Sequence, residues 1–181
     1  MTGRILLTAL AAAIAMFVWS SLAHTVLHIG DIGVKTMAEG EPAAIDALRT
    51  ATGDKSGLYL APAAAMTGQA PADTPSVFLV YHSPSVYVMS PMQLIGEFVI
   101  ELIQAIVLVF ILAQMMNASM GSRIGWSVAA GVMVAIATNG SYHLWYGFPP
   151  DYTFAMIGIQ IVGYLLIGIV AGLLLPWAKR A

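Results

Sequence analysis

Apolar residues in this chain fall into four long runs that are separated by shorter, more polar segments. A helix rises about 1.5 Å per residue and the hydrocarbon core of a bilayer is about 30 Å thick, so a run of about 20 apolar residues can cross it. The four runs reach that length and predict an all-α integral membrane protein, a bundle of four transmembrane helices. The predicted spans are residues 1–28, 92–116, 124–144 and 153–177.

The segment between the first two spans, residues 29–91, contains six of the nine acidic residues of the chain. Pro42 directly after Glu41 favours a helix start, and Gly53 favours its end. Runs of β-branched and aromatic residues predict short strands at 57–60, 76–82 and 85–89. We therefore expect a small α/β insert that is too short to bury much core by itself.

Composition supports a membrane location and excludes several function classes. Hydrophobic residues make up 59% of the chain and charged residues only 9%, whereas a soluble domain has about 25% charged residues. The net charge of -2 gives no basic footprint for binding nucleic acid. The chain contains no cysteine, which excludes disulfides and thiolate metal sites.

The positions of the basic residues predict how the spans are oriented. Four of them lie near span ends on the same side: Arg4, Arg123, Lys179 and Arg180. The positive-inside rule makes that side cytoplasmic, so both termini are expected in the cytoplasm and residues 29–91 outside it. A signal peptide cleaved after Ala23 is the alternative for the first run, whose length favours an uncleaved helix.

Small residues recur every four positions in the last two spans. Ser127, Gly131 and Ala135 lie on one face of the third span, and Gly168 and Gly172 on one face of the fourth. Small faces let helices approach closely within a membrane. We expect them to hold the bundle together, and a homodimer formed through Gly168 and Gly172 is the alternative.

Two carboxylates, Glu97 and Glu101, lie one helical turn apart inside the second span, roughly 6 and 12 Å from its outer boundary. Acids inside a spanning segment are rare and costly. The other spans also place polar residues in the outer half, namely Ser20, His24, His28, Asn139, His143 and Gln160. The inner half is almost wholly apolar. These residues are therefore expected to face each other or a pocket that opens outward.

This polar belt has three interpretations. In the first it is structural: Glu101 is protonated because of its burial and bonds to Gln160 or Asn139, and Glu97 pairs with His24 or His143. In the second it is a divalent-metal site, because imidazole and carboxylate ligands suit zinc, iron, manganese or copper. Its ligands would be His24, His28, Glu97, Glu101 and His143, although no Glu-x-x-His signature is present. In the third it is a pocket for a lipid or a quinone-like ligand.

The order of several segments is similar to that of a known group. The segments are residues 19–28, 41–49, 56–62 and 143–153, followed by a glycine-rich last span. This order resembles a group of uncharacterised bacterial inner-membrane proteins with four spans and an extracytoplasmic insert between the first two. The resemblance implies a bacterial source and the topology given above. It transfers no functional residue, because the group has no established activity.

The sequence therefore favours a non-catalytic integral membrane protein that serves as an accessory or assembly subunit of a larger membrane complex. This hypothesis follows from the small insert, the glycine faces suited to helix docking and the lack of a catalytic motif. The alternative is a membrane protein or enzyme that binds a metal or cofactor in the outer half of the bundle. A transporter is disfavoured by the apolar inner half.

Overall fold

A computed structural model of the protein describes residues 2–37, 39–84, 90–115 and 117–175. The chain divides into a helical unit, Met1–Val34 with Pro91–Ala181, and an insert unit, Lys35–Ser90. The described part of the helical unit contains four helices that are long and apolar enough to cross a membrane. They are Gly3–Thr25, Pro91–Gln114, Met120–Tyr146 and Pro150–Leu174.

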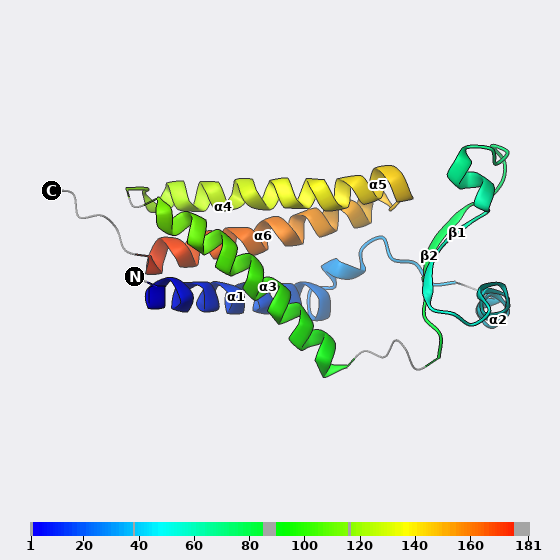
Figure 1. Cartoon of the computed structure of the whole chain (residues 1–181), viewed down its shortest axis with the longest axis horizontal. Coiled ribbons are helices and arrows are strands. Elements are labelled where there is room, and N and C mark those ends of the chain that lie inside the picture. Colours follow the sequence, from blue (N-terminus) through cyan, green and yellow to red (C-terminus); the bar gives the residue numbers. More distant parts are fainter. Residues whose placement is uncertain (1, 38, 85–89, 116, 176–181) are drawn as a thin grey trace. The chain divides into compact units, whose positions relative to one another are not determined.

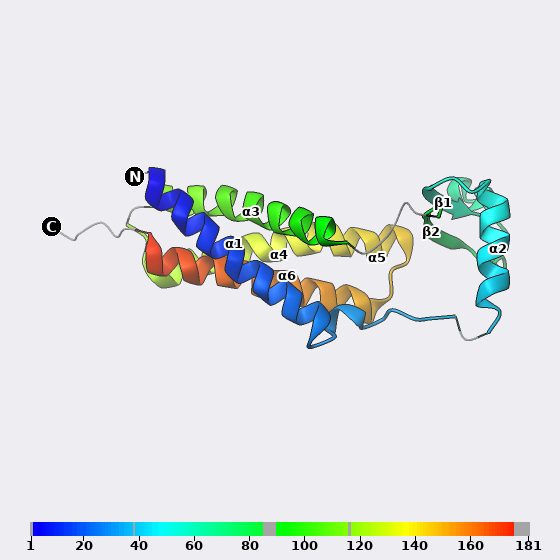
Figure 2. The same ribbon diagram turned by 90° about the horizontal axis from the view of Figure 1, so that it is seen from below.

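Figures 1 and 2 show how the long helices of the helical unit pack against one another. Its elements are α1 (Thr2–Thr25), the 3-10 turn η1 (Ile29–Asp31), α3 (Pro91–Gln114), α4 (Met120–Ala135), the π-helical turn η3 (Ile136–Gly140), α5 (Ser141–Tyr146) and α6 (Pro150–Leu174). Helix α6 packs against both α1 and α4, and α1 packs against α3. Helix α3 contacts α6 less extensively.

Local capping explains why two helices begin earlier than the predicted spans. Helix α4 begins at Met120 because the Ser119 hydroxyl accepts a hydrogen bond from the Ser122 N–H at 3.1 Å. Helix α6 begins at Pro150, since proline fits the first turn of a helix. The predicted end of the last span, with residues 177, 179 and 180, lies outside the described residues.

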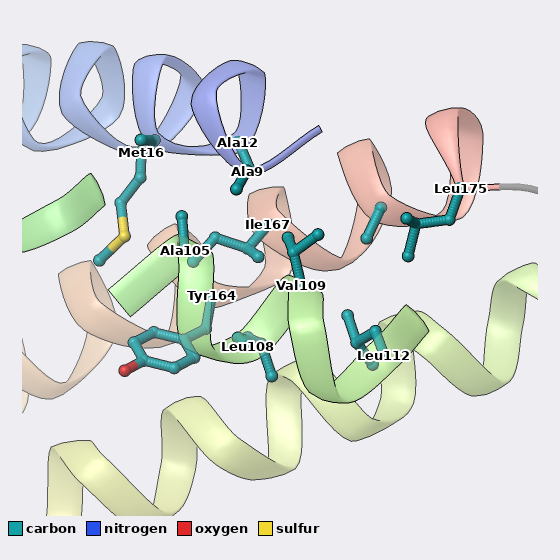
Figure 3. Close-up of a cluster of buried hydrophobic side chains, with 12 residues drawn as sticks. Ala9, Ala12, Met16, Ala105, Leu108, Val109, Leu112, Tyr164, Ile167 and Leu175 are labelled. Carbon is teal, nitrogen blue, oxygen red and sulfur yellow. The ribbon is translucent and has the colours of Figure 1, made fainter. Parts of the chain in front are cut away.

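A cluster of buried apolar side chains forms where α1, α3 and α6 meet (Figure 3). Helix α1 contributes small residues, Ala9 and Ala12, which allow the larger side chains of its neighbours to approach. Those larger side chains include Val109 of α3 and Ile167 of α6, and both are fully buried. Dispersion contacts between closely packed helices are the main source of stability where lipid surrounds the protein.

The contact between α4 and α6 uses the small residues that the sequence singled out. Ser127, Gly131 and Ala135 form a buried stripe on α4. A Cβ added at Gly168 would lie 2.8 Å from Ser127 Cβ, and one at Gly172 would lie 2.8 Å from Met120 Cγ. The expected packing role is therefore confirmed. The alternative, a homodimer through Gly168 and Gly172, stays a prediction; within the chain α4 covers that face.

Two arginines bind the carboxyl end of α6. Arg4 Nε donates to Leu174 O at 2.7 Å, and Arg123 Nη1 donates to Leu175 O at 3.2 Å. Cations stabilise the carboxyl end of a helix, where carbonyl groups lack intrahelical partners. The sequence placed Arg123 just before the third span, and the structure has it in the first turn of α4 with 1% of its surface exposed. One end of the helical unit therefore carries both cations.

The described part of the insert unit contains one α-helix and a hairpin. Helix α2 (Glu41–Thr52) ends at Gly53, and β1 (Gly57–Ala61) pairs antiparallel with β2 (Val77–Tyr81), with Gly57 opposite Tyr81. The 3-10 turn η2 (Ala63–Thr67) lies in the predicted loop. The predicted strand 85–89 lies outside the described residues. Tyr81 is the only buried side chain in the described part of the unit, and its hydroxyl donates to Asp54 Oδ1 at 2.8 Å.

The close approach of α4 and α6 can be tested with two glycines of α6. We expect Gly168→Ala to reduce the free energy of unfolding by about 1–3 kcal/mol, because its Cβ would overlap Ser127. Gly158→Ala is the matched control, since no described atom lies within 4 Å of its Cβ position. Reversible unfolding in detergent measures both, and equal effects of the two variants would contradict this packing.

The hydrogen bond from Tyr81 to Asp54 predicts that the stability of the insert depends on pH. The pKa of Tyr81 is raised above 10.0, chiefly because its hydroxyl donates to Asp54, with burial adding to the shift. The pKa of Tyr81 is higher in the folded chain than in the unfolded chain. The stabilisation from its hydrogen bond to Asp54 is therefore complete below the unfolded-state pKa and is lost as the pH rises through the folded-state pKa. Subtracting the phenolate absorbance titration of Tyr81→Phe from that of the wild type isolates Tyr81. We expect a midpoint above 10.0 that falls in the Asp54→Asn background.

Candidate functional site

A cleft of about 240 Å³ lies among α1, α3, η3 and α6. It is the place in the helical unit where most of the predicted polar belt comes together. The polar side chains that line it are Ser20, His24, Glu97, Glu101, Gln104, Thr138, Asn139 and Gln160. Apolar neighbours, including Met16, Trp19 and Met156, complete the lining. Eight of its thirteen lining residues are polar, so the cleft can form several hydrogen bonds with a bound group.

Glu101 is the most deeply buried acid of the cleft, with 1% of its surface exposed. Packing of α1 on α3 brings the Ser20 hydroxyl to it, and Ser20 Oγ donates to Glu101 Oε1 at 2.8 Å. The other carboxyl oxygen, Oε2, is buried and has no hydrogen-bond partner among the residues described. Leaving a buried polar atom without a partner costs about 1–3 kcal/mol, and more if it is charged. Glu101 Oε2 therefore keeps a hydrogen-bonding capacity that the described residues leave unused.

The amide side of the cleft is built on the π-helical turn. Asn139 Nδ2 donates to Ala135 O at 3.1 Å and to Gln160 Oε1 at 3.2 Å. The predicted bond of Glu101 to Asn139 or Gln160 is therefore wrong, because these two amides bond to each other and Ser20 bonds Glu101. The difference follows from the packing order, in which η3 and α6 are neighbours while α3 lies on α1. Single π-helical turns occur frequently at functional sites.

Two hydrogen bonds between helices support the cleft, and sequence reasoning missed both. Tyr164 Oη donates to Gln104 Oε1 at 3.0 Å, which joins α6 to α3. Trp19 Nε1 donates to Ile159 O at 2.9 Å, which joins α1 to α6. The available signal was the presence of Trp19 and Tyr164 within apolar runs, because the polar atom of a buried aromatic side chain needs a partner. We infer that both residues position the helices that carry the cleft.

The structure gathers three of the five predicted metal ligands, His24, Glu97 and Glu101, around the cleft. His24 Nδ1 donates to Ser20 O at 2.8 Å, and Glu97 is exposed. Within the described ranges, Glu97 forms no ion pair with His24 or His143, so the predicted pairing is wrong.

The other two predicted ligands are engaged elsewhere. His28 Nδ1 lies 2.9 Å from Asp31 Oδ2 on the surface, and His143 Nδ1 donates to Phe148 O at 2.6 Å. The described part of the chain contains no group of three or more His, Cys, Asp or Glu side chains arranged to hold a metal ion. The side-chain geometry therefore does not support the five-residue metal site.

Comparisons of this chain with protein-family models, with curated proteins and with solved structures find no match. The function has to be argued from the chemistry and geometry of the cleft, since a fold alone does not define one.

The contribution of the hydrogen bond between Ser20 and Glu101 to the free energy of unfolding can be measured. We expect Ser20→Ala to reduce the free energy of unfolding by about 1–3 kcal/mol, because both oxygens of Glu101 would then lack a protein partner. Ser21→Ala, at the next position of α1, is the control. In the Glu101→Gln background the cost of Ser20→Ala should shrink, and a double-mutant cycle without coupling would argue against this contact.

Proposed function

We propose that this chain is an integral protein of a bacterial inner membrane whose four apolar helices cross the bilayer as a bundle. Both termini lie in the cytoplasm and residues 29–91 lie outside it. Arg4 and Arg123 support this orientation, because they lie at the same end of the helical unit and the positive-inside rule places basic residues on the cytoplasmic side. The resemblance noted from the sequence is consistent with the same topology.

The function of this protein is to bind a small ligand in the cleft. The observation that carries the proposal is the buried, unpartnered Oε2 of Glu101, which is held in place by Ser20. A ligand that donates a hydrogen bond to this oxygen removes the cost of leaving it without a partner. The energetic gain is available only when the cleft is occupied, so it favours binding.

The charges around the cleft define the chemistry of the ligand. Glu97 and Glu101 are its acids, His24 is its only imidazole, and no lysine or arginine is among its lining residues in the described ranges. Two acidic side chains without a nearby fixed cation disfavour an anion beside them, and each attracts a cation when it is ionised. A cationic ligand or a neutral hydrogen-bond donor fits this lining better than a phosphate or a carboxylate does.

The binding role is non-catalytic, and it fits an accessory or assembly subunit of a larger membrane complex, as the sequence suggested. Such a subunit holds a ligand or a partner helix without transforming it. A divalent metal bound by His24, Glu97 and Glu101 is the competing proposal. It requires these side chains to move together, because they do not form a metal-binding group as they stand.

Native mass spectrometry of the full chain, purified in mild detergent from its own membranes, tests this function. We expect a non-protein adduct on the wild-type protein whose occupancy falls about tenfold or more in Glu101→Gln, because one hydrogen bond to a charged group is lost. The same spectra report any partner subunits, which the accessory role predicts, and any bound metal ion.

Asp31→Asn is the matched control for that experiment, because it also changes an acid to its amide but lies outside the cleft. It should keep the adduct at wild-type occupancy. The ligand-binding proposal fails if no adduct depends on Glu101. The accessory role fails if the chain is purified from native membranes without a partner.

A further inference from the structure

The backbone fixes the orientation of two side-chain amides in the cleft. Asn139 Nδ2 donates to Ala135 O at 3.1 Å, and a backbone carbonyl oxygen can only accept, so the bonded atom of Asn139 is its nitrogen. The same nitrogen donates to Gln160 at 3.2 Å, so the bonded atom of Gln160 is its oxygen, Oε1. This leaves Asn139 Oδ1, which accepts hydrogen bonds, and Gln160 Nε2, which carries two N–H donors.

These two leftover groups are unused and open. Neither has a hydrogen-bond partner in the described part of the chain. They are also not among the buried side-chain atoms that lack a partner, so both remain accessible. Asn139 and Gln160 line the same cleft as Glu101. The cleft therefore offers one unused acceptor and two unused donors in addition to Glu101 Oε2.

Hydrogen bonds between the helices place Glu101 and Gln160 at the same level of the bundle. On α1, Trp19 donates to Ile159 O of α6, and the next residue, Ser20, donates to Glu101 of α3. Gln160 directly follows Ile159, so it lies level with Glu101. The hydrogen bond that joins α6 to α3 lies one turn further along both helices and gives the same alignment. The unused groups on the two helices therefore face one part of the cleft.

We propose that the cleft binds a small neutral molecule through a primary carboxamide group. The two N–H donors of this group bond to Glu101 Oε2 and Asn139 Oδ1, and its carbonyl oxygen accepts from Gln160 Nε2. The last torsion of a glutamate side chain is soft, so Oε2 can turn toward the cleft that Glu101 lines. This inference rests on the proposed ligand-binding function and names the chemical class of the ligand.

The unused groups distinguish a carboxamide from other ligands of similar size. An ammonium supplies donors but leaves the Gln160 N–H groups without an acceptor, whereas a carboxylate supplies acceptors but leaves Glu101 without a donor. A hydroxyl has only one donor for two acceptors. A carboxamide has two donors and a carbonyl oxygen. It also carries no charge, so its transfer from water into an apolar bundle costs less than that of an ion.

The size and lining of the cleft limit the rest of the molecule. Its volume of about 240 Å³ is below the range of roughly 300–1,000 Å³ that is typical of pockets for drug-sized ligands. Apolar side chains, among them Met16, Trp19 and Met156, form part of the lining. A short hydrocarbon substituent next to the carboxamide matches both the volume and the lining.

Four probes with a short hydrocarbon chain test the assignment on the full-length wild-type protein. Butyramide, butyrate, butylammonium and 1-butanol are each titrated in mild detergent while the midpoint temperature of unfolding is measured. The rise in that temperature gives the dissociation constant by mass action. We expect butyramide to bind about tenfold more tightly than each of the other three, because it alone satisfies all the unused groups. This comparison uses unaltered protein, so it does not depend on the folding of a variant.

The variant Gln160→Glu tests the contact with the carbonyl oxygen. It keeps an oxygen that accepts from Asn139 and removes only the two N–H donors. We expect it to weaken butyramide binding about tenfold and to make butylammonium the tightest of the four probes, because the cleft gains a third acid. Gln114→Glu is the matched control, since it makes the same change on α3 outside the cleft and should keep the wild-type preference.

Each outcome gives a decision. Butyramide binding no tighter than the other probes overturns the carboxamide assignment, and so does a Gln160→Glu variant that keeps the wild-type preference. If native protein carries a Glu101-dependent adduct without a carboxamide, the ligand-binding function stands and this inference fails. If no adduct depends on Glu101, both fail.

Discussion

Polar side chains buried among apolar helices must find their partners on other parts of the same chain. This constraint governs the helical unit, because an unpaired polar group in an apolar environment costs several kcal/mol. Four side-chain contacts meet it: Ser20 with Glu101, Trp19 with Ile159, Tyr164 with Gln104 and Asn139 with Gln160. Each contact joins a different pair of helical segments, so together they fix how the helices are placed around the cleft.

Close packing of backbones is what brings these polar groups within reach. Gly131 allows Tyr164 to lie directly on α4, and from that position its hydroxyl reaches Gln104 on α3. A larger residue at position 131 would push Tyr164 outward and break the bond. At the opposite end, Arg123 joins α4 to the end of α6, where carbonyl groups need donors. Small residues and hydrogen bonds therefore act together rather than as separate sources of stability.

The four helices and the role of the small residues could be predicted, because run length and four-residue spacing depend only on local sequence. Which residues line the cleft could be predicted in part. The residues expected to face inward included Glu101, Ser20, Asn139 and Gln160. Their pairing could not be predicted, because it depends on which helices are neighbours and on how each is rotated. The π-helical turn at Asn139 was missed for a related reason: whether an Asn side chain bonds to a nearby carbonyl is decided by the surrounding helices.

Glu101 is the residue whose presence stability alone does not explain. Its Ser20 bond satisfies one oxygen, while the other remains buried without a partner in the described structure. A leucine at this position would avoid that cost of about 1–3 kcal/mol and would suit the apolar neighbours Met16 and Ile159. An acidic residue among apolar neighbours, with no contact that compensates its cost, is expected where a protein binds a ligand. The missing partner of Glu101 therefore points to a molecule that supplies it.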